Sequence, residues 1–395
     1  MRFLKIGCLF FCLAVGNTSC RKPYEPPVET INSNFLVVEG LINTGKDSTV
    51  IKLSRTVPIA EKGTLKPELR AQLVVESESN ATYPLRELKG GTYGAAPLNL
   101  DPNQKYRLRI TTTNGSSYLS DFVESKVSPL IDSISWVVKD DGVQIYSNTH
   151  DDAKKSVYYR WEYEESWQFT SQYSASFIAE VDGVKLRNPE TQDIYRCWGN
   201  NNASTIVLGS SEKLEEDVIH LNPITFIRSD SEKVMTKYSI LVKQYALTKE
   251  AFDFWQSLKK NTESLGSIFD AQPSQLTGNI KNVDNPAEPV LGYLSAGTVS
   301  QKRIFIAERE LPNWRTAYPY ACNPLDTIWL DGRPGIPKVP KGETQKYFWE
   351  KTLNMIPVDA IVSPQSGTVL AYLGASVPCA DCTIRGTNKR PEYWQ

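Results

Sequence analysis

The chain has 395 residues, 40% of them hydrophobic and 10% aromatic, and it carries 44 basic and 45 acidic side chains. This length allows two domains or one large domain with a sizeable core, and the composition excludes an intrinsically disordered chain. The net charge of −1 at pH 7 gives no electrostatic basis for binding nucleic acid. After the first 20 residues, no apolar run approaches the roughly 20 residues that a membrane-spanning helix needs.

Residues 1–19 predict an export signal. Two basic residues precede the apolar run Ile6–Val15, which is too short to span a bilayer. Small polar residues then lead to Cys20, an order typical of lipoproteins, in which this cysteine is acylated and becomes the first residue. Asn17 stands where such signals usually carry a Leu-like residue, so an ordinary signal peptide cut nearby is the alternative. We therefore expect Cys20 to carry a lipid anchor.

Residues 20–34 contain three prolines and few apolar residues, which predicts an extended tether. Residues 35–128 then carry about seven short runs rich in Val, Ile and Leu, separated by polar or glycine-bearing turns, without a helical segment. The pattern Gly-x-Tyr at Gly91, followed by Leu-x-Pro-x-x-x-Tyr-x-Leu-x-Ile at Leu100, resembles immunoglobulin-like and transthyretin-like modules. This range is expected to form a β-sandwich.

Residues 129–395 predict a larger, strand-rich α+β domain, so the whole chain is expected to be mainly β with some α. Strands are expected at 131–138, 142–147, 157–169, 238–247, 290–296 and 303–307, and a short helix at 344–355. A longer helix is expected at 248–264. Thr248 can cap it, and Phe252, Trp255 and Leu258 recur every three residues to give an apolar stripe.

The run 157–169, VYYRWEYEESWQF, alternates like a strand with one core face and one amphipathic face. The core face is expected to carry Val157, Tyr159, Trp161 and Tyr163, and the other face Tyr158, Arg160, Glu162 and Glu164. Aromatic side chains in and after this run form a candidate binding or interface cluster. Its members are Tyr158, Trp161, Trp167, Phe169 and Tyr173. Three interpretations remain open at this stage: a core, a protein–protein interface or a small-ligand site. At the other end of the domain, Pro391, Tyr393 and Trp394 are expected to pack back on the body, with a dynamic or partner-docking tail as the alternatives.

Four cysteines follow Cys20. They are Cys197, Cys322, Cys379 and Cys382. An even number in an exported chain favours two disulfide bonds, with three pairings open. A metal half-site or a redox-active CxxC at Cys379 and Cys382 is the alternative, although the chain has no second CxxC and no βαβ pattern around this one.

The sequence predicts no catalytic residue, no cofactor and no metal site. It has two histidines, and it lacks a GxSxG turn, an HExxH motif and a glycine-rich phosphate loop. The obvious carboxylates for a glycosidase-like pair are Glu162, Glu164 and Glu165, but alternating glutamates on a strand are usually solvated. We therefore expect that the protein is not an enzyme.

Several runs resemble one family across nearly the whole chain after the signal. They include LVVEGLINTG, PLIDSISW, YYRWEYEESWQF, YSILVKQYALT, NTESLGSIFDAQPSQLTGNI and the closing CADC. Together they are similar to the domain-of-unknown-function 4249 family, lipoproteins of Bacteroidota bacteria. This resemblance implies an outer-membrane lipoprotein encoded beside a TonB-dependent transporter, and it implies no activity. Arg21 and Lys22, rather than acidic residues, follow Cys20, which leaves the periplasmic and cell-surface faces both open.

These observations favour a non-enzymatic accessory or binding subunit, anchored in the outer membrane and acting with a TonB-dependent barrel protein in nutrient uptake. The ligand is left unspecified. Two alternatives remain at this stage. One is an envelope hydrolase that uses paired carboxylates on an exported polymer, and the other is a structural component of envelope assembly or adhesion.

Overall fold

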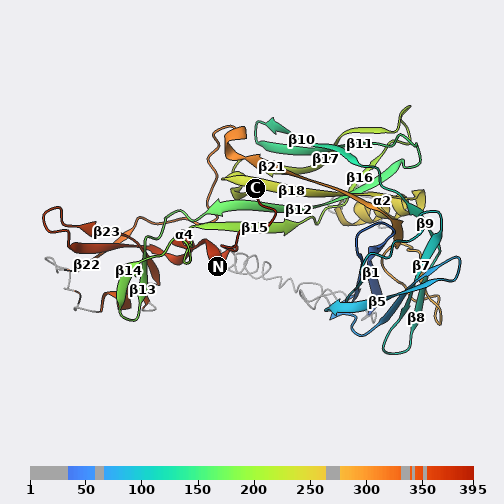
Figure 1. The fold of residues 1–395 in the computed structure, drawn as a ribbon, viewed down its shortest axis with the longest axis horizontal. Coiled ribbons are helices and arrows are strands. Elements are labelled where there is room, and N and C mark those ends of the chain that lie inside the picture. Colours follow the sequence, from blue (N-terminus) through green and yellow to red (C-terminus); the bar gives the residue numbers. More distant parts are fainter. Residues whose placement is uncertain (1–33, 58–65, 264–275, 331–338, 340–342, 350–353) are drawn as a thin grey trace, which may run out of the picture.

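The computed structural model describes residues 34–57, 66–263, 276–330, 339, 343–349 and 354–395. The predicted signal peptide, Cys20 and all of the tether except Asn34 lie outside these residues. Three units built mainly of strands follow one another along the molecule (Figure 1). The predicted class, mainly β with some α, is confirmed.

The first unit is the predicted β-sandwich. Its strands are β1 (Leu36–Asn43), β2 (Thr49–Arg55), β3 (Lys66–Pro67), β4 (Gln72–Ser77), β5 (Thr82–Lys89), β6 (Thr92–Ala95), β7 (Lys105–Thr111), β8 (Ser117–Ser120), β9 (Val123–Lys126), β19 (Ile280–Asn282) and β20 (Ser295–Gly297). Two strands change sheets: β5 pairs with β4 and then β6, and β9 pairs with β7 and then β20. The two sheets are therefore joined at both edges. β19 and β20 come from the range that the sequence assigned to the second domain.

The core of this first sandwich follows from simple alternation. In β7, Tyr106, Leu108 and Ile110 are buried, whereas Arg107 and Arg109 point outward. Both arginines bind the carboxylate of Glu76 on β4, with N–O distances of 2.6 Å. A period of two thus places one set of side chains in the core and the other at the surface.

The second unit is another sandwich. One sheet contains β10 (Ile131–Lys139), β11 (Gly142–His150) and β17 (Val218–Arg228). The facing sheet, which we call the central sheet, runs in the order β15 (Arg196–Asn202), β12 (Tyr158–Thr170), β18 (Lys237–Ala246) and β21 (Val299–Ala307), and β16 (Val207–Ser210) also pairs with β12. On β12, Tyr159, Trp161 and Tyr163 are buried between the two sheets, as the alternation predicted. The indole N–H of Trp161 donates to Gln244 Oε1 at 2.9 Å.

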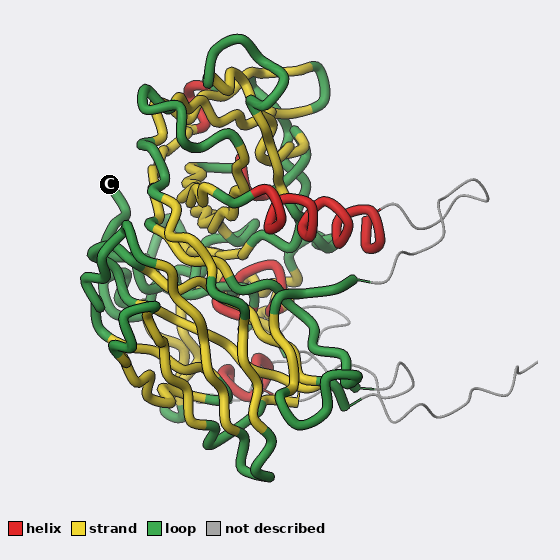
Figure 2. The backbone as a smooth tube through the Cα atoms, turned by 90° about the vertical axis from the view of Figure 1, so that its right-hand side faces the viewer, coloured by secondary structure: helices red, strands yellow, loops and turns green. Residues whose placement is uncertain are grey.

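Helix α2 (Lys249–Glu263) follows β18 directly and lies between the central sheet and the first sandwich (Figures 1 and 2). The hydroxyl of Thr248 accepts the N–H of Ala251 at 3.3 Å, so the predicted cap is present. The buried side chains of α2 are Ala251 and Phe254. Trp255 and Leu258, from the predicted apolar stripe, remain half-buried.

The third unit lies at the far end of the molecule (Figure 1). It contains the hairpin β13 (Phe177–Glu180) and β14 (Gly183–Leu186), a sheet of β22 (Asp326–Trp329), β24 (Val369–Ser376) and β23 (Met355–Val362), and helices α3 (Thr344–Trp349) and α4 (Val377–Ala380). Three short 3-10 turns complete the described elements: η1 (Glu232–Val234), η2 (Glu308–Glu310) and η3 (Cys382–Ile384).

The predicted extent of the helix at 344–355 is wrong at its C-terminal end, because Met355 begins a strand. Asn354 has a φ of 37°, a left-handed backbone that a right-handed helix does not contain. The residues that follow, Ile356, Val358 and Ile361, are β-branched and favour the extended state.

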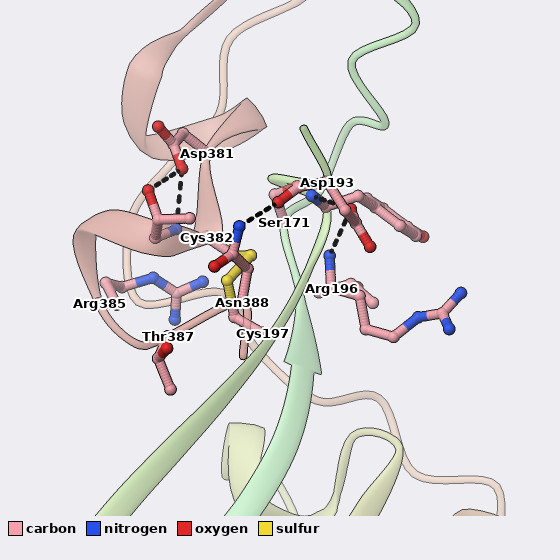
Figure 3. The surroundings of a disulfide bond; sticks show 12 residues. Ser171, Asp193, Arg196, Cys197, Asp381, Cys382, Arg385, Thr387 and Asn388 are labelled. Atoms are coloured by element: carbon pink, nitrogen blue, oxygen red, sulfur yellow. Dashed lines mark hydrogen bonds between the residues drawn. A yellow bond between two sulfur atoms is a disulfide. The ribbon is translucent and has the colours of Figure 1, made fainter. Parts of the chain in front are cut away.

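The cysteines form two disulfide bonds. Cys197 on β15 pairs with Cys382, and Cys322 pairs with Cys379, each with a Cα–Cα distance of 5.8 Å. Around the first of these, Asn388 Nδ2 donates to the carbonyl of Asp193 at 2.8 Å (Figure 3). Both members of the CxxC therefore bond to distant partners, so neither the metal half-site nor the redox alternative applies.

Candidate functional site

A groove of about 700 Å³ lies where the first sandwich, the central sheet and α2 meet. Its floor is the outer face of the central sheet, the face that points away from the core of the second sandwich. Cross-strand register places two rows of side chains there: Arg160, Tyr245 and Val299 in one, and Glu162, Lys243 and Gln301 in the other. The floor is therefore mostly polar.

The opposite wall is mostly apolar. Val37 and Leu41 on β1, and Val50 on β2, face the groove, and Val50 is 44% exposed. Leu291 extends this wall, because its N–H donates to the carbonyl of Leu36 and its carbonyl accepts the N–H of Val38. Gly292 permits this close approach, since its φ is 119° and a Cβ there would lie 2.0 Å from Val38 O.

Aromatic side chains close one end of the groove. Phe254 and Trp255 come from α2, with their rings edge to face at 5.6 Å, and Tyr293 comes from the loop beside β1. Tyr293 packs against Phe254 at 5.4 Å. The groove thus combines an aromatic end, an aliphatic wall and a polar floor, the mixture typical of ligand pockets.

Arg160 is the best-held charge on the floor. Its guanidinium lies 4.0 Å from the ring centroid of Trp255 and 5.0 Å from that of Tyr245. Its Nη2 donates to Glu162 Oε1 at 2.8 Å, and the Tyr245 hydroxyl donates to Glu162 Oε2 at 2.8 Å. Burial, together with the Glu162 carboxylate, raises the pKa of Tyr245 far above its usual range, so this hydroxyl stays protonated.

The candidate carboxylates are all occupied, and they do not share one face. Glu164 binds Lys243 on the same outer face as Glu162. Glu165 projects into the opposite, inner face, where it is buried. There it accepts from Lys233 Nζ at 2.6 Å, from the Tyr238 hydroxyl at 2.8 Å and from Asn201 Nδ2 at 3.0 Å. Glu165 is thus a member of a buried polar network within the second sandwich.

The predicted aromatic cluster does not form one site. Trp161 and Phe169 have no exposed surface, so they belong to the core interpretation. Tyr158 packs against Phe252 of α2 at 5.0 Å, and Trp167 is half-buried, with its indole N–H 3.3 Å from Glu232 Oε1. Tyr173 lies in the third unit, where its hydroxyl donates to the carbonyl of Asn323 at 3.3 Å. The groove instead uses Trp255 and Tyr245.

A family model described as a domain of unknown function (DUF4249) matches residues 21–303. The chain belongs to this family. All the residues that line the groove fall within the matched range. No curated protein shows a significant match to this DUF4249 chain.

A solved structure with some similarity to this DUF4249 chain is a two-domain fibronectin type III segment of chicken tenascin. The identity is 12%, and the match covers 54% of this chain and 91% of that chain, with a TM-score of 0.16. At this TM-score, the likeness supports no conclusion about the fold or the function. Among the described residues of the DUF4249 chain, no group of metal-ligating side chains is found, and no helix combines the length and apolarity that crossing a membrane requires.

At its other end, the same outer face of the central sheet carries the C-terminal segment. Trp394 is buried against Phe305 on β21 and Trp198 on β15, with centroid distances of 5.6 and 6.4 Å. Tyr393 stacks under Arg303 at 3.8 Å. The sequence prediction that these two aromatic residues pack back on the body is therefore confirmed. We call this region the tail end of the central sheet.

The sequence predicts part of the polar floor of the groove and the helix that carries Trp255, but not the apolar wall. The outward alternation of Arg160 and Glu162 was predicted, and Trp255 was placed on the correct helix. The apolar wall was missed, because Val37, Leu41 and Val50 belong to strands read only as sandwich core. A weak signal was available, since Val50 alternates with buried Thr49 and Ile51 and so had to face outward.

Proposed function

We propose that this chain is an outer-membrane lipoprotein, anchored through Cys20, that acts as a non-enzymatic accessory and ligand-binding subunit of a TonB-dependent transporter in nutrient uptake. The observation that carries the proposal is the groove between the two sandwiches, which offers a mixed apolar and polar surface. Its volume of about 700 Å³ lies in the range of pockets that hold small ligands.

The chemistry of the floor supports binding without catalysis. Glu162 uses both oxygens, one for Arg160 and one for Tyr245, and Glu164 binds Lys243. A general acid needs a carboxyl group whose proton can reach the substrate, and a nucleophile needs a free oxygen. Carboxylates engaged in this way serve better to fix the shape of the floor.

The anchor part of the proposal is tested by removing the acylated thiol. In the variant Cys20→Ser, the protein should move from the membrane fraction to the soluble fraction and lose labelling by a palmitate analogue. As a matched control, Cys322→Ser removes a cysteine that lies in a disulfide, and it should leave labelling unchanged. Undiminished labelling of the Cys20→Ser variant by the palmitate analogue would exclude lipid attachment at this position.

The transporter part is tested by crosslinking intact cells, followed by affinity purification of the tagged full chain and mass spectrometry. We expect a TonB-dependent barrel protein to be recovered in a crosslinked band. The Cys20→Ser variant is the control, because a soluble form should lose this contact. Recovery of the wild-type chain without any barrel protein would overturn the proposed partnership.

A further inference from the structure

The outer face of the central sheet already binds one peptide, namely the end of its own chain. The residues of this face lie in successive cross-strand rows, which run from Arg160 and Tyr245 in the groove to Ser166 and Phe305 at the tail end. Both ends thus belong to one continuous surface. At the tail end, the segment 391–395 lies on it.

The tail end shows which chemistry this face accepts. Trp394 inserts between two aromatic rings, and the hydroxyl of Tyr393 lies 2.7 Å from Ser166 Oγ. Lys237 Nζ donates to an oxygen of Gln395 at 2.6 Å. A short segment with aromatic side chains, turned by the bond from the Trp394 N–H to the carbonyl of Pro391 at 3.0 Å, is therefore held by ring contacts, a stacked arginine and a few hydrogen bonds.

The groove contains the same kinds of side chain. Among the described residues, no segment of the chain lies across them. A stacked arginine, Arg160, again stands beside an aromatic ring, here Trp255. The facing wall adds Val37, Leu41 and Val50, which an apolar side chain would cover. Burial of such aliphatic surface favours peptide side chains over sugars, whose rims are hydroxylated.

Charge narrows the occupant further. On the floor, Arg160 is compensated by Glu162 and Lys243 by Glu164. On the opposite wall, Glu39 and Asp47 are exposed, and Glu39 forms a long ion pair with exposed Lys52 at 3.9 Å. The charged side chains that line the groove are thus three acidic ones, Glu39, Asp47 and Glu162, and two basic ones, Arg160 and Lys243. The groove therefore carries a small excess of negative charge, which disfavours an acidic ligand.

We propose that the groove binds a short peptide that carries an aromatic or large aliphatic residue flanked by basic residues. The apolar residue covers Val50 and Leu41 and abuts Trp255, and the basic residue lies near Glu39 and Asp47. This inference rests on the proposed function, and it names the class of ligand that the accessory subunit takes.

The test uses the full chain in detergent and isothermal titration calorimetry. The probes are acetylated and amidated hexapeptides of sequence KAWAKA, EAWAEA and KAAAKA, with maltohexaose as the sugar probe. We expect saturable binding of KAWAKA, about tenfold weaker binding of KAAAKA because an aromatic anchor is lost, and weaker binding of EAWAEA at low salt. Comparable binding of all three peptides would overturn the inference.

The variant Val50→Asp places a carboxylate on the apolar wall and should weaken KAWAKA binding by about tenfold or more. Val137→Asp is the matched control, since Val137 is also an exposed strand valine, 45% exposed against 44% for Val50, on the far sheet of the second sandwich. Trp255→Leu is a second groove variant in case Val50→Asp fails to fold, and it should weaken binding by a similar factor.

Three further outcomes would overturn the inference. They are no binding of any peptide, equal weakening by Val50→Asp and Val137→Asp, and maltohexaose binding that depends on Val50 while the peptides do not bind. The last outcome would make the groove a sugar site. Because this experiment measures binding and the crosslinking experiment measures contact with a barrel protein, each proposal can fail while the other stands.

Discussion

The two ends of the central sheet's outer face differ in what covers them. At the tail end, Arg303 stacks on Tyr393, and Trp394 fills the space over Phe305. At the groove end, Arg160 stacks on Trp255 in a similar way, and a cavity remains beside it. Among the described residues, one end of this face is thus covered by the chain's own C-terminal segment, and the other end forms the floor of the groove.

The difference comes from what stands opposite each end. The tail end faces the chain's own C-terminal segment, which η3 and the disulfide between Cys197 and Cys382 hold close to β15. The groove end faces the first sandwich, whose rigid strands β1 and β2 cannot collapse into the space. A floor fixed on one side and a wall fixed on the other leave room for a ligand.

The largest effect should come from removing the disulfide bond that holds the C-terminal segment close to β15. The double variant Cys197→Ala/Cys382→Ala removes a link across 185 residues and should lower the free energy of unfolding by about 4 kcal/mol in urea denaturation. Removing the pair Cys322 and Cys379, 57 residues apart, should cost about 1 kcal/mol less on loop length alone. Equal losses would show that loop entropy does not set the difference.

The next largest effect should come from removing the buried Trp394 side chain at the tail end. Trp394→Ala should release the tail and cost about 2 kcal/mol of docking free energy, because a nearly buried indole becomes exposed. Hydrogen exchange of residues 387–395 measures this directly. Tyr393→Phe, which loses only the contact with Ser166, should cost about 1 kcal/mol. Unchanged exchange in the Trp394→Ala variant would mean that the tail is held elsewhere.

A smaller effect is expected from the two stacked arginines, Arg160 and Arg303. A double-mutant cycle of Arg160→Met and Trp255→Leu should give a coupling of about 1 kcal/mol in thermal or chemical unfolding, as expected for a partly buried cation–π contact. The cycle of Arg303→Met and Tyr393→Leu should give a similar value. A coupling at one end only would break the parallel between them.

The smallest effect lies away from both ends and provides a reference. The carboxylate of Asp132, 2.8 Å from His150 Nδ1, raises the pKa of this exposed imidazole above its usual range. Its contribution to stability is therefore fully present below pH ~6.5 and is lost as the pH rises through the raised pKa. NMR titration should show the raised value in the wild type and a return toward normal in Asp132→Asn. The NMR signals of the groove and of the tail end should show the same pH dependence in the wild type and in the Asp132→Asn variant.

Local patterns predicted the elements of both regions well. The alternation of β12 identified Tyr159, Trp161 and Tyr163 as core, and the Thr248 cap located the start of α2. The even count of cysteines predicted two disulfides. Local patterns failed where the next element is set by a single backbone position, as at Asn354. They also did not distinguish Phe169, which is core, from aromatic residues available to a ligand.

By itself, the sequence determined the class of the fold, the faces of its strands and the presence of a peptide-like tail rich in aromatic residues, because these follow from periodicity and from neighbours in the chain. The tertiary structure decided the rest. The groove exists only because Val50, Trp255 and Arg160, distant in sequence, meet between two sandwiches. Residues 280–297 complete the first sandwich for the same reason, since strand pairing across such separations depends on the packing of whole sheets.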